Sequence, residues 1–265
     1  MSETLNVDGI GSVGLSFTER GAGQPILLLH GGAGPTSVVP WADFLARGRP
    51  ARVFTPTHPG FAGTPRPAAL GNIGGLARLY AALIDKLGLD GVSVIGNSIG
   101  GWIAAELALL ARTRISSLLL VDAVGIEVPG SPVADPFSMP LDELSRLSYH
   151  DPARFRIDTS KFTPQQKAGM AANLSALKVY AGNMTDPSLR ARLSASALPP
   201  TLVVWGASDR VVHPAYGRDY AQAIAGAQFR LLRDTGHVPQ SETPELLAET
   251  VWPFVTEHAP RRAAV

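Results

Sequence analysis

The sequence contains no cysteine. This absence excludes disulfide bonds, thiol nucleophiles and cysteine-ligated metals, and it is consistent with a reducing compartment. No apolar run approaches the ~20 residues that a membrane-spanning helix requires. Residues 1–6 carry no basic stretch followed by an apolar one, so no signal peptide is expected. We therefore expect a cytoplasmic protein.

A surplus of charge of either sign is also missing. The 23 lysines and arginines nearly balance the 22 aspartates and glutamates, so the formal net charge is +1. This balance favours neither nucleic acid nor an anionic membrane as a partner. With 265 residues, of which 45% are apolar, the chain has the composition of one globular domain that carries an insertion.

Short aliphatic runs alternate with helical patterns over most of the chain. A short opening hairpin is expected at residues 4–7 and 15–18, and further strands at 25–29, 52–55, 92–95, 115–121, 201–205 and 228–232. Helical patterns occur at 41–46, 73–87, 99–111, 215–225 and 244–258. This alternation predicts an α/β fold, a mostly parallel eight-stranded sheet with helices on both faces.

The alternation stops between residues 125 and 198. No strong strand pattern occurs there, and helices are expected at 141–147, 164–184 and 187–193. We interpret this segment as an all-α lid inserted into a core formed by residues 1–124 and 199–265. Its large apolar side chains are candidates either for a substrate pocket or for the lid's own small core: Phe137, Met139, Tyr149, Phe155, Phe162, Met170, Tyr180 and Met184.

Ser98 lies in the sequence Gly-Asn-Ser-Ile-Gly, between the expected strand at 92–95 and the expected helix at 99–111. A serine on such a strand-to-helix turn has a strained backbone, and the flanking Gly96 and Gly100 leave room because they lack a Cβ. The hydroxyl then projects at a helix N-terminus, where the helix dipole favours developing negative charge. Ser98 is therefore the candidate nucleophile.

A serine hydroxyl needs an adjacent base, and the base needs an orienting acid. In an open α/β sheet these partners are expected after the carboxyl ends of strands. His237 is the candidate base, Asp209 the candidate acid, and Asp122 a rival acid because it also ends a strand. His30 and His58 follow strands as well, but each precedes a glycine or proline and is expected to be structural.

Acyl transfer also requires N–H donors for the oxyanion. One donor is expected to be the backbone N–H of Ile99, the residue after the nucleophile. The other is expected in the glycine-rich loop after the strand at 25–29, where we select Gly32, with Gly31 or Ala33 if the register differs by one residue. No cofactor and no metal are expected.

Four motifs occur in a characteristic order: His30-Gly31-Gly32, Gly96-Asn97-Ser98-Ile99-Gly100-Gly101, Trp205-Gly206-Ala207-Ser208-Asp209 and Gly236-His237. With these motifs the chain resembles the α/β-hydrolase superfamily from about residue 5 to residue 255. It is most similar to the capped, single-domain branch, which holds esterases, lactonases, cofactor-free haloperoxidases (perhydrolases) and carbon–carbon bond hydrolases of ring-cleavage products. The serine argues against the dehalogenase and epoxide hydrolase branches, which use an aspartate there.

The Gly-Asn-Ser-x-Gly-Gly form resembles the carbon–carbon hydrolases in particular, but the chain departs from them elsewhere. Val238 stands where those enzymes usually have a tryptophan, and Thr57 replaces the first aspartate of the family segment Asp-x-x-Gly-x-Gly. Those enzymes also use a lid arginine against the substrate carboxylate, for which the sequence offers Arg154, Arg156, Arg190 and Arg192.

The expected function is hydrolysis of a small or medium apolar carboxylic ester through an acyl-enzyme on Ser98. The alternatives are a carbon–carbon bond hydrolase of a ring-cleavage diketone, a lactonase or perhydrolase, and a non-catalytic ligand-binding protein. In each case the expected partner is a small molecule, and the sequence leaves the oligomeric state open.

Overall fold

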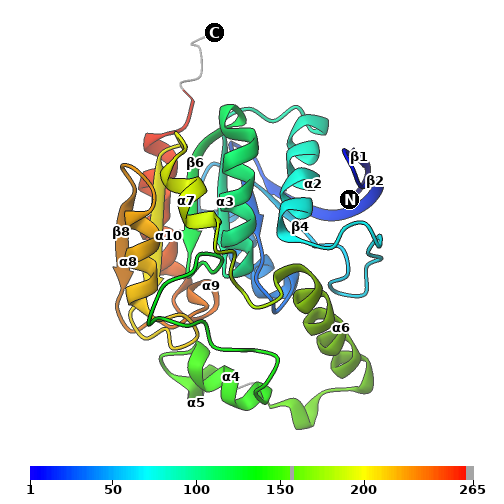
Figure 1. Ribbon diagram of the computed structural model, residues 1–265, viewed down its shortest axis with the longest axis vertical. Coiled ribbons are helices and arrows are strands. Elements are labelled where there is room, and N and C mark those ends of the chain that lie inside the picture. Colours follow the sequence, from blue (N-terminus) through cyan, green and yellow to red (C-terminus); the bar gives the residue numbers. More distant parts are fainter. Residues whose placement is uncertain (156–157, 261–265) are drawn as a thin grey trace.

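An eight-stranded sheet forms the centre of the computed structural model, which describes residues 1–155 and 158–260 (Figure 1). The strand order is β1-β2-β4-β3-β5-β6-β7-β8. The strands are β1 (Ser2–Val7), β2 (Gly11–Gly21), β3 (Gln24–Leu29), β4 (Ala51–Pro56), β5 (Val92–Asn97), β6 (Ile115–Val121), β7 (Thr201–Gly206) and β8 (Gln228–Leu232).

All neighbouring strands from β4 to β8 are parallel, whereas β1 and β2 are antiparallel to their neighbours. The expected short hairpin at residues 4–7 and 15–18 was wrong in its extent. β2 runs for 11 residues because its first half pairs with β1, while Phe17–Gly21 pairs with β4. A strand shared between two partners is longer than local sequence signals indicate.

Helices cover both faces of the sheet. Alternate residues of a strand point to opposite faces, and in the central strands both sets are apolar, so both faces must be covered. Leu118 and Leu120 of β6 join one core cluster, while Leu119 and Val121 join the other. The first cluster lies under α2 (Ile73–Lys86), α3 (Ile99–Ala111) and α8 (Pro214–Gln222), and the second under α1 (Val39–Gly48) and α10 (Pro244–Glu257). The α/β fold class predicted from the sequence is confirmed.

Residues 125–198 contain α4 (Leu141–Ser148), α5 (Pro152–Phe155), α6 (Pro164–Ala181) and α7 (Leu189–Ser194). In Figure 1, α4, α5 and α6 lie below the sheet, and α7 lies beside α3. α6 ends before the expected residue 184 because Gly182 takes a positive φ of 52° and its N–H bonds the carbonyl of Lys178. Within the described ranges, no helix is long and apolar enough to cross a membrane.

The start of this segment lies beside the residues that precede α7. Gly125 forms a parallel bridge with Thr185, and its carbonyl accepts the N–H of Asp186 at 2.7 Å. Both ends of the Arg192 guanidinium bond the carboxylate of Glu106 on α3, at 2.6 and 2.7 Å, and Asp186 joins them at 2.7 Å. The chain therefore leaves the core and returns to it at one joint.

Candidate active site

Ser98 lies on the sharp turn between β5 and α3. Its backbone has φ 56° and ψ −120°, a conformation that costs energy in a residue with a Cβ and that recurs at functional sites. Its N–H donates to the carbonyl of Val121 at 3.0 Å, and its carbonyl accepts the N–H of Val124 at 3.3 Å. The end of β6 therefore holds the strained turn on both sides, and Ser98 is left 8% exposed.

The glycines around Ser98 permit close backbone contacts that no other residue would allow. A Cβ on Gly96 would lie 2.1 Å from the carbonyl oxygen of Gly100, and a Cβ on Gly100 would lie 2.3 Å from that of Leu29. The motif thus packs the start of α3 against the end of β3. This contact brings the turn next to the glycine-rich loop that follows β3.

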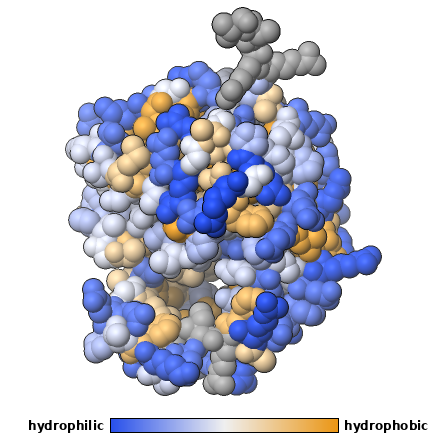
Figure 2. Space-filling view, turned by 180° about the vertical axis from the view of Figure 1, so that it is seen from behind, coloured by the Kyte–Doolittle hydropathy of each residue, from blue (hydrophilic) through white to orange (hydrophobic). Residues whose placement is uncertain are grey.

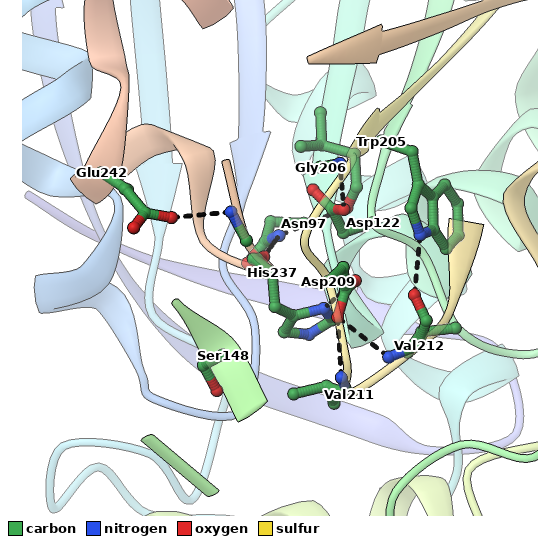
Figure 3. A network of polar contacts seen from close by, with 12 residues as sticks. Asn97, Asp122, Ser148, Trp205, Gly206, Asp209, Val211, Val212, His237 and Glu242 are labelled. Atoms are coloured by element: carbon green, nitrogen blue, oxygen red, sulfur yellow. Dashed lines mark hydrogen bonds and ion pairs between the residues drawn. The ribbon is translucent and has the colours of Figure 1, made fainter. Parts of the chain in front are cut away.

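His237 and Asp209 form a buried pair on the loops after β8 and β7 (Figure 3). Nδ1 of His237 donates to Oδ2 of Asp209 at 2.8 Å. This bond assigns the ring proton to Nδ1, so Nε2 carries the lone pair and can accept a proton. The structure therefore brings together the base and the acid selected from the sequence.

The loop that carries Asp209 is fixed by several further hydrogen bonds. Oδ1 of Asp209 accepts the N–H groups of Val211 and Val212, at 2.8 and 2.9 Å. The indole N–H of Trp205 donates to the carbonyl of Val212 at 2.8 Å (Figure 3). With the bond from His237, the carboxylate of Asp209 accepts three N–H donors. These bonds fix the carboxylate with Oδ2 toward His237.

Asn97 connects the serine turn to the loop of His237, a role that the sequence reasoning missed. Its side-chain N–H₂ donates to the carbonyl of His237 at 3.0 Å, and its Oδ1 accepts from Gln240 at 3.1 Å. Asn97 was visible in the sequence as the residue before the serine, but it was interpreted only as a feature of the carbon–carbon hydrolases. Nothing local in the sequence distinguished Gln240.

The loop after β3 passes beside the nucleophile turn. A Cβ on Gly31 would lie 3.1 Å from Cβ of Ser98, and one on Gly32 would lie 2.9 Å from Leu177 of α6. Among the residues that the structure describes, no acceptor receives the N–H of Gly32 or of Ile99. The N–H groups of Gly31 and Ala33 also have no acceptor within the described residues. Which of the three residues supplies the second oxyanion donor is therefore still a prediction.

His30 and His58 form a buried stack next to the glycine-rich loop. Their ring centroids are 3.6 Å apart, Nε2 of His30 accepts the N–H of His58 at 3.1 Å, and Nε2 of His58 donates to the carbonyl of His30 at 2.9 Å. Burial lowers the pKa of His30 to about 4, and burial and the neighbouring His30 lower that of His58 well below its ordinary value. Both rings are therefore neutral at pH 7 and bridge the ends of β3 and β4.

Asp122, the rival acid, follows β6 directly and lies next to Asp209. Its Oδ1 accepts the N–H of Gly206 at 2.8 Å (Figure 3). The side chain is fully buried. The hydrogen bond from Nδ1 of His237 goes to Asp209 and not to Asp122.

Figure 2 shows a hollow between the main body of the molecule and its lower part, with hydrophobic atoms at the border. Tyr149, at the end of α4, lies close to the loop of His237, because a Cβ on Gly236 would lie 2.8 Å from its Cα. The Tyr149 ring stacks on Phe155 at 5.3 Å. Tyr180, in contrast, is buried and bonds the carbonyl of Pro59 at 2.8 Å. Of the candidate apolar side chains, Tyr149 thus lies next to the loop of His237 with Phe155 stacked on it, whereas Tyr180 packs against the core.

The four candidate arginines of residues 125–198 differ in their contacts. Arg192 is paired with Glu106 and Asp186, which raise its pKa, and Arg190 approaches Asp219 at 3.4 Å. The guanidinium of Arg154 lies 5.2 Å from the ring of Phe155. Arg156 lies outside the described residues.

These groups together can perform nucleophilic substitution at a carbonyl carbon. A serine on a strained turn lies beside N–H groups that no acceptor receives within the described residues, and Nδ1 of a nearby imidazole bonds a buried carboxylate, which leaves Nε2 for the substrate side. This combination supplies a nucleophile, a proton acceptor and donors for a developing oxyanion.

The class that this fold and site define agrees with the comparison to protein families. The model of the alpha/beta hydrolase family matches residues 26–250. The chain belongs to the α/β-hydrolase family, and it is a hydrolase.

Similarity in sequence and similarity in fold alone point to different hydrolases. The chain is 27% identical to a 2-hydroxy-6-oxononadienedioate/2-hydroxy-6-oxononatrienedioate hydrolase of Pseudomonas putida, with 94% of each protein covered. It is 28% identical to a 2-hydroxy-6-oxo-6-phenylhexa-2,4-dienoate hydrolase of Burkholderia cepacia, with 90% of each covered. Among solved structures, a thermophilic esterase from Thermogutta terrifontis matches with a TM-score of 0.72 at 23% identity, covering 98% of this chain and 99% of that one. The last similarity concerns the fold alone.

Proposed function

We propose that the protein is a serine hydrolase in which Ser98 is the nucleophile, His237 the general base and acid, and Asp209 the residue that orients the imidazole. The observation that carries this proposal is the buried 2.8 Å hydrogen bond between Asp209 and His237, tied through Asn97 to the strained turn of Ser98. The N–H groups of Gly32 and Ile99 are the proposed oxyanion donors.

For the substrate we favour a carbon–carbon bond in a 2-hydroxy-6-oxo-dienoate, the class named for the curated relatives. This reverses the order expected from the sequence, which put esters first. In the proposed reaction Oγ of Ser98 attacks the 6-oxo carbonyl while His237 takes the hydroxyl proton. Before this attack the dienoate ketonises: its 2-hydroxyl loses a proton and C5 gains one, so that C5 becomes an sp3 carbon. Collapse of the tetrahedral oxyanion then breaks the C5–C6 bond, and the released electron pair is delocalised through the C3–C4 double bond onto the 2-oxo oxygen, which takes up the proton held by His237. Water then hydrolyses the acyl-enzyme to a carboxylic acid.

Residues 125–198 are the proposed lid. Two contacts support this role: Leu177 on α6 lies over Gly32, and Tyr149 lies against the loop of His237. The hollow in Figure 2 lies between this part and the main body. A lid in this position would decide the size and polarity of the accepted acyl group.

An ester remains the second candidate because of two specific observations. Arg190 and Arg192 already face Asp219, Glu106 and Asp186, so neither offers an unpaired charge to a substrate carboxylate. Val238 also stands where the carbon–carbon hydrolases usually have a tryptophan. The paired Arg190 and Arg192 suit a substrate without a carboxylate, and Val238 is a departure from the carbon–carbon hydrolase pattern.

The mechanism is tested by the change Ser98→Ala. We expect it to lower kcat for an activated aryl ester by at least ~1000-fold and to abolish covalent labelling by a fluorophosphonate, with an unchanged circular dichroism spectrum. Ser12→Ala, at an exposed position of β2, is the matched control and should retain both properties. Full turnover by the Ser98 variant would contradict the proposal, and an unlabelled wild type would favour a non-catalytic binding protein.

The bond type is tested by comparing kcat/KM for 2-hydroxy-6-oxo-6-phenylhexa-2,4-dienoate with that for neutral phenyl and alkyl esters. We expect the dienoate to be preferred. If esters are turned over by a Ser98-dependent reaction and the dienoate is not, the serine mechanism stands and the substrate class is an ester.

A further inference from the structure

Asp122 and Asp209 place two carboxyl groups next to one imidazole. One carboxylate oxygen of each aspartate and one ring nitrogen of His237 all lie within 4.8 Å of one another. Asp122 is fully buried and Asp209 is 1% exposed. Ionising two buried carboxylates at this separation would cost a large free energy, so one of them is expected to hold a proton.

The hydrogen bonds indicate which aspartate is charged. Asp209 accepts three N–H donors, from Val211, Val212 and His237, and donors of this kind stabilise the ionised carboxylate. Asp122 accepts a single donor, the N–H of Gly206, at Oδ1. Its Oδ2 is buried and, within the described part of the chain, has no hydrogen-bond partner. A proton on that oxygen would turn an unpaired acceptor into a donor.

We propose that Asp122 carries a proton on Oδ2 and donates it to Asp209, so that an acid–carboxylate pair holds Asp209 against His237. The inference rests on the proposed function, in which Asp209 orients the base. Asp122 would then be a positioning residue that acts on His237 through Asp209. Burial, followed by the negative charge of Asp209, raises the pKa of Asp122 well above its ordinary value, in agreement with this arrangement.

The groups around Asp122 come from three strand ends. Asp209 follows β7 and His237 follows β8, and both can carry charge. On the β5 side the neighbouring residues are Asn97 and Ser98, which pair with the end of β6 and carry none. The rival arrangement is an ionised Asp122, which would add a second negative charge beside the imidazole.

Two substitutions at this position separate the hydrogen bond from the charge. Asn has the shape of a protonated aspartate, can still accept from Gly206 and donate to Asp209, and tolerates the φ of 46° found at Asp122. Gly also tolerates that φ but supplies no donor. Asp234→Asn is the matched control, because Asp234 also has a positive φ of 51° and its side chain is 83% exposed.

We expect Asp122→Asn to stay within about threefold of the wild-type kcat and Asp122→Gly to lose about 10- to 100-fold with little change in KM. The acid limb of the kcat/KM profile should not move in the Asn variant. An Asn variant as impaired as the Gly variant, or an acid limb displaced downward by about one pH unit, would show that Asp122 acts through its charge and would overturn the proposal.

Stability gives a second readout that does not require turnover. Because the pKa of Asp122 is raised on folding, the chain takes up a proton when it folds, and the stability of the wild type is penalised progressively as pH rises above about 4. Asn removes this penalty. The Tm difference between Asp122→Asn and wild type should therefore grow from pH 4 to pH 8, and a difference that is constant with pH would overturn the proposal.

The proton itself can be observed in the resting enzyme by the infrared carbonyl band of a protonated carboxylic acid. We expect this band at pH 7 in the wild type and in Ser98→Ala, and its loss in Asp122→Asn. Because the Ser98 variant is measured too, the result is independent of catalysis. If the wild type lacks the band, the proposal is overturned even if Ser98 proves to be the nucleophile. If the wild type shows the band and Asp122→Asn loses it, the proposal is supported even if Ser98 proves not to be the nucleophile.

Discussion

The side-chain amide of Asn97 donates a hydrogen bond of 3.0 Å to the carbonyl oxygen of His237. Asn97 immediately precedes Ser98, so this bond joins the nucleophile turn to the loop of the proposed base. Gln240 holds the other end of the same amide at 3.1 Å. The relative position of Ser98 and His237 is therefore set in part by side chains that take no part in proton transfer.

Replacing Asn97 with Ala should lower kcat about 10-fold, because the buried carbonyl of His237 would lose this donor and its loop would relax. KM should change less than kcat, since the amide bonds the protein's own backbone. Steady-state kinetics and a thermal unfolding curve would measure both effects. Asn183→Ala, at an exposed position, serves as the control. An unchanged kcat in Asn97→Ala would mean that the tether is dispensable.

Gly206, at the end of β7, lies against the backbone of the loop that carries His237. A Cβ there would lie 2.1 Å from the carbonyl oxygen of Gly236, so Gly206→Ala should force apart the loops that carry Asp209 and His237. We expect a lower Tm and at least a ~10-fold loss of kcat. Gly48→Ala is the matched control, because a Cβ there meets nothing within 4 Å. Wild-type activity and Tm in the Gly206 variant would refute this prediction.

The stacked pair His30 and His58 should make the protein sensitive to acid. Both histidines have a pKa that is lowered on folding, that of His30 to about 4 from 6.5. Their contribution to stability is therefore complete above about pH 6.5 and is lost as pH falls toward about 4, because the unfolded chain binds protons that the folded chain does not. Each histidine can contribute up to about 1.4 kcal/mol per pH unit in this range.

Thermal unfolding between pH 7 and pH 4.5 measures this loss. Asp122 acts in the opposite direction, so the decrease of Tm should be steeper in Asp122→Asn than in the wild type. His213→Asn, a change of an exposed histidine outside the stack, serves as the control. A Tm that stays flat down to pH 4.5 in both proteins would show that the buried pair accepts protons without cost.

Much of the fold was predictable because the central strands are aliphatic on both faces. The expected limits of α3, β6 and β8 agree with the structure. The elements that escaped prediction depend on distant contacts or are very short. α5 and α9 (Pro239–Glu242) have four residues each, which is too few to show a helical period, and the length of β2 depends on its pairing with β4.

The site was predictable to the extent that each candidate follows a strand. Sequence order alone left Asp122 and Asp209 as alternatives, because both follow strands. Asp122 follows β6, which is next to the strand of Ser98, and Asp209 follows β7, one strand further along the sheet. The choice depends on which carboxylate meets Nδ1 of His237, a contact across 28 residues. The stacking of His30 on His58 likewise requires that the loops after β3 and β4 lie side by side. No local sequence pattern predicts such a contact.

The joint at Gly125 and Asp186 has a consequence for how this protein could diversify. The bridge between Gly125 and Thr185, the 2.7 Å bond from Asp186 and the ion pair of Arg192 with Glu106 close the stem from which α4, α5 and α6 emerge. Since the stem is held by the core, a change in the stretch beyond it leaves both attachment points in place. The contacts that would have to be rebuilt are those with the loops after the strands, such as the 2.7 Å bond from the N–H of His237 to the carbonyl of Ser148. In the proposed lid role, this stretch would change substrate preference while the bonds among Asn97, Asp209 and His237 stay in place.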